Sequence, residues 1–509
     1  MSMVLEKNAV TATAALEVSD LRSALEFLKQ HPGEYVETDE PVDPMAELSG
    51  VYRYVGAHGT VMRPTQIGPA MVFNKIKGYD DVRVAIGLLA SRSRVAQLMN
   101  TTPENLGFLF KEAVANPVPP ELISPATRAA CQEVVHLATD PDFDILKILP
   151  APTNTEVDAG PFFTMGLVYA ADPENGQHDV TIHRLCVQSK DEISIFIQPG
   201  GRHIGVFQAK AEAVGKPLPV SISIGVDPAI YIGTCFEAPT TPLGYDELAI
   251  AGSIRKRPVE LVDCVAVRER AIANAEVVIE GEILPNVRVR EDQNTNTGNA
   301  MPEFPGYNGR ANPALQIIKV KAITHRRHPI LQTCIGPSFE HCSMAGIPTE
   351  ASILTMVGLA MPGYVQNVHC PAPGNGKYLT VLQVKKTSPV DEGRQRQAAL
   401  LAFSAFSELK HVILVDEDVD IFDLSDVMWA MTTRYQGDTS TVFIPGVRCH
   451  PLDPSSDPEF DRSIRDHGIA CKTIFDCTVP FALKDRFERA RFKEVDVNRF
   501  IPGFKQQGR

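Results

Sequence analysis

Three separate segments of the chain carry side chains that could together hold a divalent metal ion. The first contains Asp179 and His183, the second His203 and the third Glu247. Imidazole and carboxylate ligands together favour a transition metal such as manganese over calcium. A helix that begins at His203, after Gly200-Gly201, would direct free backbone N–H groups at an anion such as a phosphate. The residues alone therefore indicate a metal–phosphate site, with the alternative that each polar residue is merely structural at the end of a strand.

Two further motifs suggest functions that their spacing does not support. A phosphate-binding loop needs Gly where Pro371 stands and Ser or Thr where Tyr378 stands, so we interpret residues 374–377 as a hairpin turn. The acidic run 416–423 lacks the spacing and the turn glycine of a calcium-binding loop. We therefore predict a solvated turn and a helix cap in that run.

Composition and charge limit the class of protein. The chain has 509 residues, of which 44% are hydrophobic and 22% charged, as is typical of a soluble globular protein. At about 150 residues per domain, this length predicts about two to four domains. The formal net charge is −13, which argues against a nucleic-acid partner.

Cysteine usage and apolar stretches bear on the compartment. The ten cysteines include no Cys-x-x-Cys pair, so neither a zinc ribbon nor a thioredoxin-like redox motif is indicated. Unpatterned cysteines in a chain of this size are typical of a reduced, intracellular protein. No signal peptide is evident, and the longest apolar stretch, residues 353–361, is far shorter than the ~20 residues of a membrane span. The sequence therefore predicts a cytoplasmic protein with no membrane partner.

The elements that would position these residues differ along the chain. Apolar residues at helical spacing predict helices at 21–30, at 82–99 and through Phe110, with a short strand at 35–38. The Pro-rich residues 117–125 predict a linker.

The middle of the chain reads as many short strands. Runs rich in β-branched residues and separated by turn signals predict strands at 167–171, 181–188, 193–198, 220–226, 259–267 and 277–283. Helices are predicted at 203–214 and 245–254. This pattern favours a barrel or a sandwich. Residues 292–313 are rich in Asn, Gly and Pro and predict a long irregular loop, which is often functional.

The last part of the chain alternates helices and strands. A helix at 397–409, a strand at 411–415 and a helix at 423–432 predict an α/β domain. A charged helix is predicted at 485–493, packed on a partner or on a neighbouring domain.

With these segments in place, the sequence resembles the UbiD family of non-oxidative decarboxylases, from about Asp20 to Gly503. The resemblance is most specific in four segments, which are Asp179–Arg184, Gly200–Ile204, Glu247–Gly252 and Glu303–Gly309. Within the family it is most similar to the gallate and protocatechuate decarboxylases, through Ala46–Arg53, Met301–Tyr307 and Ile347–Ser352.

The resemblance implies an α+β fold of three parts. Residues 1–125 would form an N-terminal α/β segment, and residues 126–330 a split β-barrel that binds FMN. Residues 331–509 would form a C-terminal α/β domain that completes the active site and mediates oligomerisation. The expected assembly is a homo-oligomer, either a dimer or a hexamer. The cofactor would be prenylated FMN, and a flavin prenyltransferase would supply it.

The same resemblance assigns a cofactor site. A metal, usually manganese(II), and a potassium ion clamp the cofactor phosphate in this family. The metal ligands would be Asp179, His203 and Glu247, and potassium would bind near Thr234. The remaining cofactor contacts would be Thr181, Ile182, His183, Arg184 and Arg202. Many members have Asn where this chain has Asp179, which leaves the identity of the metal open.

For catalysis, the family pairs an arginine with two acidic residues five positions apart. Arg184 matches the arginine and Glu303 the second acidic residue, which carries a proton. By ungapped count the first acidic position falls on Gly298, so one carboxyl of the network is expected to be missing. His341 and His450, which match histidines of this branch, are expected to take over part of its work.

The implied reaction is the reversible decarboxylation of a para-hydroxylated benzoic acid, from gallate or protocatechuate to pyrogallol or catechol and CO2. Arg184 would hold the carboxylate bidentately, Glu303 would exchange the proton at the ring carbon, and a histidine would deprotonate the para hydroxyl. One alternative is another aromatic or α,β-unsaturated acid as substrate. A flavin carrier without catalysis is a second alternative, which the Arg184–Glu303 pair disfavours.

Overall fold

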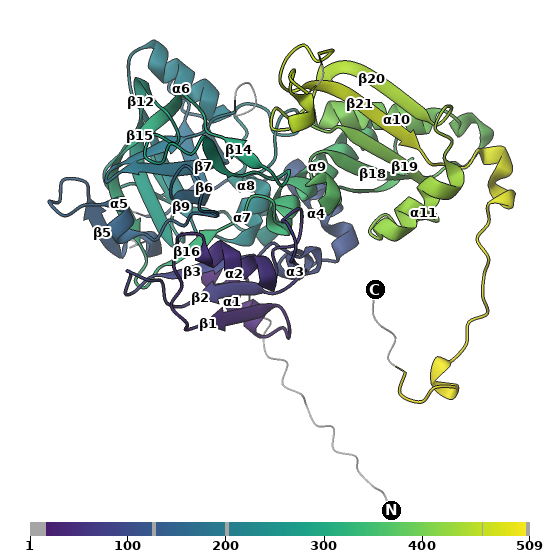
Figure 1. Ribbon diagram of the computed structural model, residues 1–509, viewed down its shortest axis with the longest axis horizontal. Helices are drawn as coiled ribbons and strands as arrows, with labels where there is room; N and C mark the ends of the chain where they lie inside the picture. The colour runs from purple at the N-terminus through teal and green to yellow at the C-terminus, as the bar shows by residue number, and fades with distance from the viewer. Residues whose placement is uncertain (1–16, 125–128, 199–202, 461, 505–509) are drawn as a thin grey trace, which may run out of the picture.

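The computed structural model describes residues 17–124, 129–198, 203–460 and 462–504, and it mixes helices and sheets (Figure 1). A small sheet near the N-terminus, a central barrel and a C-terminal sheet lie side by side. The predicted fold, an N-terminal α/β part, a barrel and a C-terminal α/β part, is confirmed.

The N-terminal part is built on a four-stranded sheet in the order β1-β2-β3-β16. Its strands are β1 (Tyr35–Thr38), β2 (Ala70–Phe73), β3 (Arg83–Ile86) and β16 (Ile330–Thr333). The helices are α1 (Leu21–Lys29), α2 (Glu47–Val55), α3 (Arg92–Leu98) and α4 (Leu106–Ala115). Because β16 follows the barrel in sequence, the chain returns to its first sheet, in parallel register with β3, before it enters the C-terminal domain.

The predicted helix at 82–99 is wrong in its first half, which is strand β3. Val84 and Ile86 are fully buried there because they pack in the hydrophobic core on one face of the sheet, and the strand itself pairs with β2 and β16. Gly87 then takes a φ of +80°, and a Cβ at this position would lie 1.7 Å from the hydroxyl of Tyr52. The helix begins only after Ser91, whose side chain caps α3 by accepting from the backbone N–H of Arg94.

The central part is a barrel of six antiparallel strands, closed by pairing of β12 with β15. Around the barrel the strands are β12 (Val277–Val289), β9 (Leu218–Ile224), β6 (Phe162–Ala171), β7 (His178–Ser189), β8 (Glu192–Ile195) and β15 (Leu315–His325). Buried aliphatic side chains such as Leu185, Ile222, Ile279 and Ile318 form its core. Closure leaves no free edge in the ring, which suits strands this rich in β-branched residues.

The remaining elements of the central part surround the barrel. Helix α6 (His203–Ala213) begins at the residue predicted, and α8 (Leu248–Arg255) begins three residues later than predicted. The others are β4 (Glu121–Leu122), β5 (Val134–Leu137), β10 (Glu260–Asp263), β11 (Arg270–Ile272), α5 (Ile145–Ile148) and α7 (Pro228–Gly233).

The predicted irregular loop at 292–313 contains a hairpin. Strands β13 (Asn299–Pro302) and β14 (Asn308–Arg310) pair in antiparallel fashion. In the turn between them, Gly306 takes a φ of +95° and donates its N–H to the carbonyl of Glu303. A run rich in Asn, Gly and Pro conceals such short strands, because it lacks the alternation by which strands are recognised.

The C-terminal domain is a five-stranded mixed sheet in the order β17-β18-β19-β21-β20. Its strands are β17 (Val365–His369), β18 (Leu379–Val384), β19 (His411–Asp416), β20 (Thr441–Arg448) and β21 (Ile469–Asp476). Its helices are α9 (Phe339–Ala360), α10 (Arg394–Ala405) and α11 (Leu424–Arg434). As predicted, residues 374–377 lie in the connection of the β17–β18 hairpin.

Helix α9 is long and apolar enough to cross a membrane by length and composition alone. However, 78% of its apolar 18-residue stretch is buried inside the protein. Side chains such as Ile353, Leu354 and Val357 pack in the core of the C-terminal domain. Its apolar character is therefore that of a core helix.

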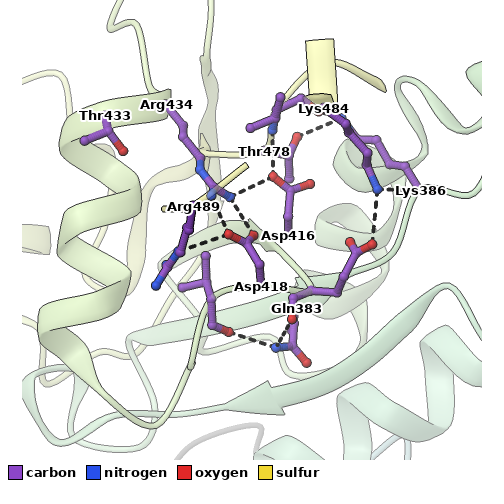
Figure 2. A network of polar contacts seen from close by, with 12 residues as sticks. Gln383, Lys386, Asp416, Asp418, Thr433, Arg434, Thr478, Lys484 and Arg489 are labelled. Atoms are coloured by element: carbon purple, nitrogen blue, oxygen red, sulfur yellow. Dashed lines mark hydrogen bonds and ion pairs between the residues drawn. The ribbon is translucent and has the colours of Figure 1, made fainter. Parts of the chain in front are cut away.

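The acidic run that begins at the last residue of β19 holds an ion-pair network, which Figure 2 shows. Asp416 is buried and accepts a hydrogen bond from Arg434 Nη1 at 3.1 Å. Asp418 accepts from Arg434 Nη2 at 2.6 Å and from Arg489 Nε at 3.1 Å. The predicted helix cap is present at Asp423, but the prediction of a solvated turn is wrong for Asp416.

The predicted charged helix at 485–493 is also wrong. Only Phe481–Arg486 forms a short 3-10 helix, and residues 487–493 are not helical. The segment has no apolar face that could pack along a helix axis. Its Arg489 instead lies over the ring of Trp429 on α11, 3.8 Å from the ring centre, and pairs with Asp426 at 2.9 Å.

Candidate active site

A cavity of about 180 Å³ lies where the barrel meets the C-terminal domain. Its walls come from β7, the β13–β14 hairpin, the start of α9 and loops of the C-terminal domain. All four side chains predicted to be catalytic line it, namely Arg184, Glu303, His341 and His450. Four predicted cofactor contacts line it as well, namely Thr181, Ile182, His183 and Thr234. Arg202 lies outside the described residues.

The side chain of Arg184, on β7, is 10% exposed and is held by two carboxylates. Its Nε and Nη2 donate to the two carboxylate oxygens of Glu291, both at 2.8 Å. Its Nη1 donates to Glu303. Burial disfavours the charged guanidinium, but Glu303 and Glu291 outweigh that effect and raise the pKa of Arg184. Arg184 is therefore a fixed positive charge in the wall of the cavity.

The second carboxylate of this network, Glu291, corrects an expectation from the sequence. The ungapped count placed the first acidic residue of the family's network at Gly298, which has no side chain. It therefore predicted that this carboxylate is missing and that His341 and His450 take over part of its work. Glu291 instead stands just beyond β12, with its side chain fully buried. It also accepts from the backbone N–H of Asn312 at 2.9 Å. A count with fixed spacing could not find it, because the loop that follows β12 sets the distance.

Glu303 lies at the tip of the β13–β14 hairpin, which fixes its backbone on both sides. Its N–H donates to the carbonyl of Tyr307 at 2.8 Å, and its own carbonyl accepts from Gly306 at 2.9 Å. Its side chain is 15% exposed, more than that of Glu291 at 0%. Of the two carboxylates on Arg184, Glu303 is the one that can exchange a proton with a molecule in the cavity.

The two predicted histidines meet at one aromatic ring. The ring of His341, on α9, stacks on Phe304 with ring centres 5.2 Å apart and an interplanar angle of 4°. His450 packs edge-on against the same ring at 4.7 Å. Phe304 directly follows Glu303, so the hairpin carries both a carboxylate that lines the cavity and the ring that both histidines contact. The structure thus brings together residues that are far apart in sequence.

Lys377 is a residue of this cavity that sequence reasoning missed. It lies in the β17–β18 turn, is 8% exposed, and lines the cavity. Its Nζ is 5.5 Å from the ring centre of Phe304 and pairs with Glu408 at 2.9 Å. The rejected Gly-Asn-Gly-Lys motif was the available signal, since a lysine in an otherwise tight turn needs a buried partner.

The three predicted metal ligands also come together. Asp179 on β7, His203 at the start of α6 and Glu247 before α8 each offer a ligand atom, and these atoms lie within 4.8 Å of one another. Nδ1 of His203 lies 2.8 Å from Oδ1 of Asp179. They line a small cavity that shares Thr181 and Glu237 with the main one. A metal here would lie beside the end of a molecule bound in the main cavity.

The electrostatics of this cluster call for a cation. Burial raises the pKa of Glu247 well above its ordinary value, and the negative charge of Asp179 raises it further. Within the described part of the chain, Oε2 of Glu247 is buried without a hydrogen-bond partner. A bound divalent ion would satisfy that oxygen and offset the repulsion between the carboxylates. The donor set of two carboxylates and one imidazole suits manganese(II).

Comparisons with known proteins agree with this geometry. Three domains described for 3-octaprenyl-4-hydroxybenzoate carboxy-lyase (UbiD) match the chain, the N-terminal domain at residues 25–113, the Rift-related domain at 124–338 and the C-terminal domain at 342–477. A gallate decarboxylase of Lactiplantibacillus plantarum is 57% identical over 477 residues, which are 94% of this chain and 97% of that protein.

Solved structures extend the comparison to three dimensions. The apo 3,4-dihydroxybenzoic acid decarboxylase from Enterobacter cloacae superimposes with a TM-score of 0.91 at 62% identity, over 96% of this chain and 99% of that one. An evolved dimeric form of the UbiD-class enzyme HmfF from Pelotomaculum thermopropionicum, in complex with prenylated FMN (prFMN), gives a TM-score of 0.79 at 34% identity. That match covers 93% of this chain and 97% of the other.

Proposed function

The chain belongs to the UbiD family of carboxy-lyases, and from that premise we propose that it reversibly decarboxylates a para-hydroxylated benzoic acid. The substrate would be gallate or protocatechuate, and the products pyrogallol or catechol and CO2. The observation that carries the proposal is the single cavity lined by Arg184, Glu303, His341 and Lys377. A flavin carrier without catalysis would need no such set of charged and titratable groups.

The cofactor of the proposed reaction is prenylated FMN, which when bound supplies the electron sink for loss of CO2. Asp179, His203 and Glu247 would hold manganese(II) against its phosphate, with potassium near Thr234. The unpartnered oxygen of Glu247 and the closeness of the metal cluster to the main cavity support this arrangement. Thr181, Ile182 and His183 would contact the flavin, and Arg202 is assigned by resemblance alone.

Arg184 and Glu303 would act on the carboxyl end of the substrate. Glu291 occupies the Nε–Nη2 edge of Arg184, so the bidentate contact with substrate expected from the sequence is not available there. A substrate carboxylate would use the remaining N–H groups of Nη1 and Nη2. Glu303 would deliver the proton to the ring carbon that loses CO2, and take it back in the reverse direction.

The para hydroxyl would be bound at the histidine side of the cavity. His450 accepts from the backbone N–H of Leu452 at Nδ1, 3.0 Å away, so the proton of its neutral ring lies on Nε2. That nitrogen lies 3.4 Å from a carboxylate oxygen of Glu408, which leaves no lone pair for a substrate. We therefore assign the base to His341, and to Lys377 the stabilisation of the phenolate that forms.

A panel of benzoic acids tests this function. The enzyme would be produced together with a flavin prenyltransferase, which we propose as its cofactor supplier in the cytoplasm, and CO2 release would be measured. We expect turnover of gallate, protocatechuate or both, and none of benzoate or 3-hydroxybenzoate, because these lack the para hydroxyl. Equal turnover of benzoates without that hydroxyl would contradict the assignment. Turnover of only acrylic acids would favour the alternative substrate class.

The metal site has its own test. His203→Ala removes one of three ligands, so we expect the variant to purify with little manganese and little flavin. Metal analysis and the flavin absorbance of the purified protein measure both. A variant that retains both in full would show that the cluster is not the cofactor site.

We also propose a homo-oligomer, either a dimer or a hexamer. Beyond Phe487 the chain extends away from the C-terminal domain (Figure 1). Its apolar side chains are exposed, with Phe492 at 92%, Phe500 at 69% and Ile501 at 55%. Contact with a second copy would cover them. Light scattering of the purified protein measures the mass of the assembly.

A further inference from the structure

One buried carboxylate outside the Arg184 network connects the barrel to the C-terminal domain beside the cavity. Glu408 follows α10 and its side chain is 6% exposed. Its Oε1 accepts from Nε2 of Gln198, on the barrel side, at 2.8 Å. Its Oε2 accepts from Nζ of Lys377, on the C-terminal domain, at 2.9 Å. Both partners line the active-site cavity, although Glu408 itself does not.

The same carboxylate faces His450. Nε2 of His450 lies 3.4 Å from Oε2 of Glu408, while the backbone N–H of Leu452 donates to Nδ1 at 3.0 Å. The backbone N–H requires a lone pair on Nδ1, so the ring proton is on Nε2 and points toward the carboxylate. Glu408 and Leu452 together fix both the orientation and the tautomer of the imidazole.

Lys377 and His450, which both pair with Glu408, also contact the ring of Phe304. Nζ of Lys377 is 5.5 Å from the centre of Phe304, and His450 meets that ring edge-on at 4.7 Å. Phe304, which follows Glu303 on the β13–β14 hairpin, also stacks with His341 of α9. A carboxylate beside a buried ammonium fixes its position and cancels part of its positive field. Glu408 therefore holds Lys377 in place and lowers the positive electrostatic potential at the cavity wall.

We propose that Glu408 is a positioning residue of the decarboxylase, which holds Lys377 and His450 in the cavity wall and tempers the positive potential at the para hydroxyl of the substrate. The inference rests on the proposed function, since it needs a phenol bound beside Lys377. Among the described residues, Tyr378 and Lys472 also interact electrostatically with Glu408, and Cys449 donates its thiol to the backbone carbonyl of Glu408 at 3.4 Å. None of these three lines the cavity, so the effect on a bound phenol runs through Lys377.

The test uses 4-nitrocatechol, whose visible spectrum reports ionisation of its hydroxyl groups, bound to the flavin-loaded enzyme. The pH at which the bound catechol is half ionised would be compared in wild type and in Glu408→Gln. Removing the carboxylate leaves the charge of Lys377 uncompensated, which favours the phenolate. We expect the midpoint to move to lower pH by about one unit, since an opposite charge within ~4–6 Å has effects of about 1–3 units.

Activity supplies a second readout. In Glu408→Gln we expect kcat for the accepted benzoate to fall by about tenfold or more, because Lys377 and His450 lose their common partner, with flavin and metal content unchanged. Glu408→Asp keeps the charge but withdraws it, so its midpoint should move in the same direction by less. If Glu408→Gln fails to fold, Glu408→Asp carries the test.

A matched control is available in the same domain. Glu350 is a fully buried glutamate that also holds a cation, Arg92 at 2.8 Å, and a histidine, His369 at 3.0 Å, but it does not line the cavity. Glu350→Gln should lower thermal stability and leave the catechol midpoint unchanged. Equal midpoints in wild type, Glu408→Gln and Glu408→Asp would overturn the inference while the proposed function stands. No binding of the catechol to wild-type enzyme would overturn both.

Discussion

Arg184 and Arg434 each have a side chain that is little exposed, at 10% and 2%, and is held between two carboxylates, but they lie in different parts of the molecule. Arg184 belongs to a barrel strand, and its partners Glu291 and Glu303 follow β12 and sit on the β13–β14 hairpin. Arg434 ends helix α11, Asp416 ends strand β19 and Asp418 follows that strand (Figure 2). In both clusters one carboxylate is nearly inaccessible and the other is partly exposed.

The two clusters differ in their surroundings on the more exposed side. Arg184 and Glu303 line a cavity between two domains, beside Phe304 and its two histidines. Arg434 lies against Trp429, 4.9 Å from its ring centre, and shares Asp418 with Arg489 from the C-terminal segment. A buried ion pair is therefore no indication of function by itself. Its position relative to a cavity distinguishes chemistry from the attachment of one segment to another.

The strongest test of this distinction is Glu303→Gln. The amide keeps the shape of the side chain but cannot exchange the proton, so we expect kcat to fall by roughly 10²–10⁴-fold. Flavin content, metal content and melting temperature should stay near those of wild type. Turnover is measured as CO2 release from the accepted benzoate. Near-normal turnover would remove Glu303 from the mechanism and make the Arg184 cluster as architectural as the other.

The reciprocal change is Arg434→Met. It leaves Asp416 buried without its guanidinium, and breaking a buried pair in this way costs about 3–5 kcal/mol. We expect that loss in the free energy of unfolding, measured by urea titration, with kcat per folded enzyme unchanged. A drop in kcat comparable to that of Glu303→Gln would show that the network of Figure 2 reaches the active site.

A further buried carboxylate, Glu340, differs from those in the two arginine clusters because its hydrogen bonds come from backbone N–H groups. Glu340 accepts from the N–H groups of Gly87 and Leu89, and burial raises its pKa to about 7. The folded state holds this proton more tightly than the unfolded state, whose value is near 4.5. Folding stability is therefore lost as pH rises from about 4.5 to about 7, by about 3 kcal/mol at ~1.4 kcal/mol per pKa unit.

Glu340→Gln isolates that contribution. Urea titrations between pH 4.5 and 7.5 would give the free energy of unfolding of the variant and of wild type. We expect the wild-type value to fall relative to the variant across this window and to stay parallel above it. Parallel curves throughout would show that Glu340 is ionised in the folded protein.

The smallest expected effect is that of Asp418→Asn. Its side chain is 39% exposed, so solvent screens its pairs with Arg434 and Arg489. Exposed pairs contribute about 0.2–1 kcal/mol, and we expect a loss in that range with unchanged kcat. Thermal melting measures the change. A loss as large as that of Arg434→Met would mean that Asp418, rather than Asp416, is the main partner of the arginine.

The sequence predicted the architecture well where a regular pattern was long enough. Five of the six barrel strands, all but β15, and the helix that begins at His203 were predicted from their patterns, whereas the strand predicted at 259–267 is β10, outside the barrel. The helix predicted at 82–99 failed because strand β3 is buried on both faces, with Val84 and Ile86 on one and Ala85 on the other, and such a strand is hard to tell from a buried helix by pattern alone. The hairpin that carries Glu303 was predicted as an irregular loop, because its strands are too short to show a pattern.

The candidate site was predictable where a residue sits in a recognisable segment. Asp179, His203, Glu247, Arg184 and Glu303 are of that kind, and the structure places them in two adjoining cavities. Glu291, Lys377 and Glu408 were not found. Each is brought to its place by a loop whose length, rather than whose composition, sets the contact, and single-sequence patterns do not encode loop paths.

Strand β16 has a consequence for biosynthesis. The N-terminal sheet pairs β3 with β16, which leaves the ribosome only after the whole barrel. Until then β3 is an open edge, with buried residues such as Val84 and Ile86 in the finished protein. Open edges of apolar strands invite association with other chains. The first domain to be translated is therefore among the last to be completed. Any nascent chain released before Ile330 exposes the unpaired edge of β3, which can associate with other chains.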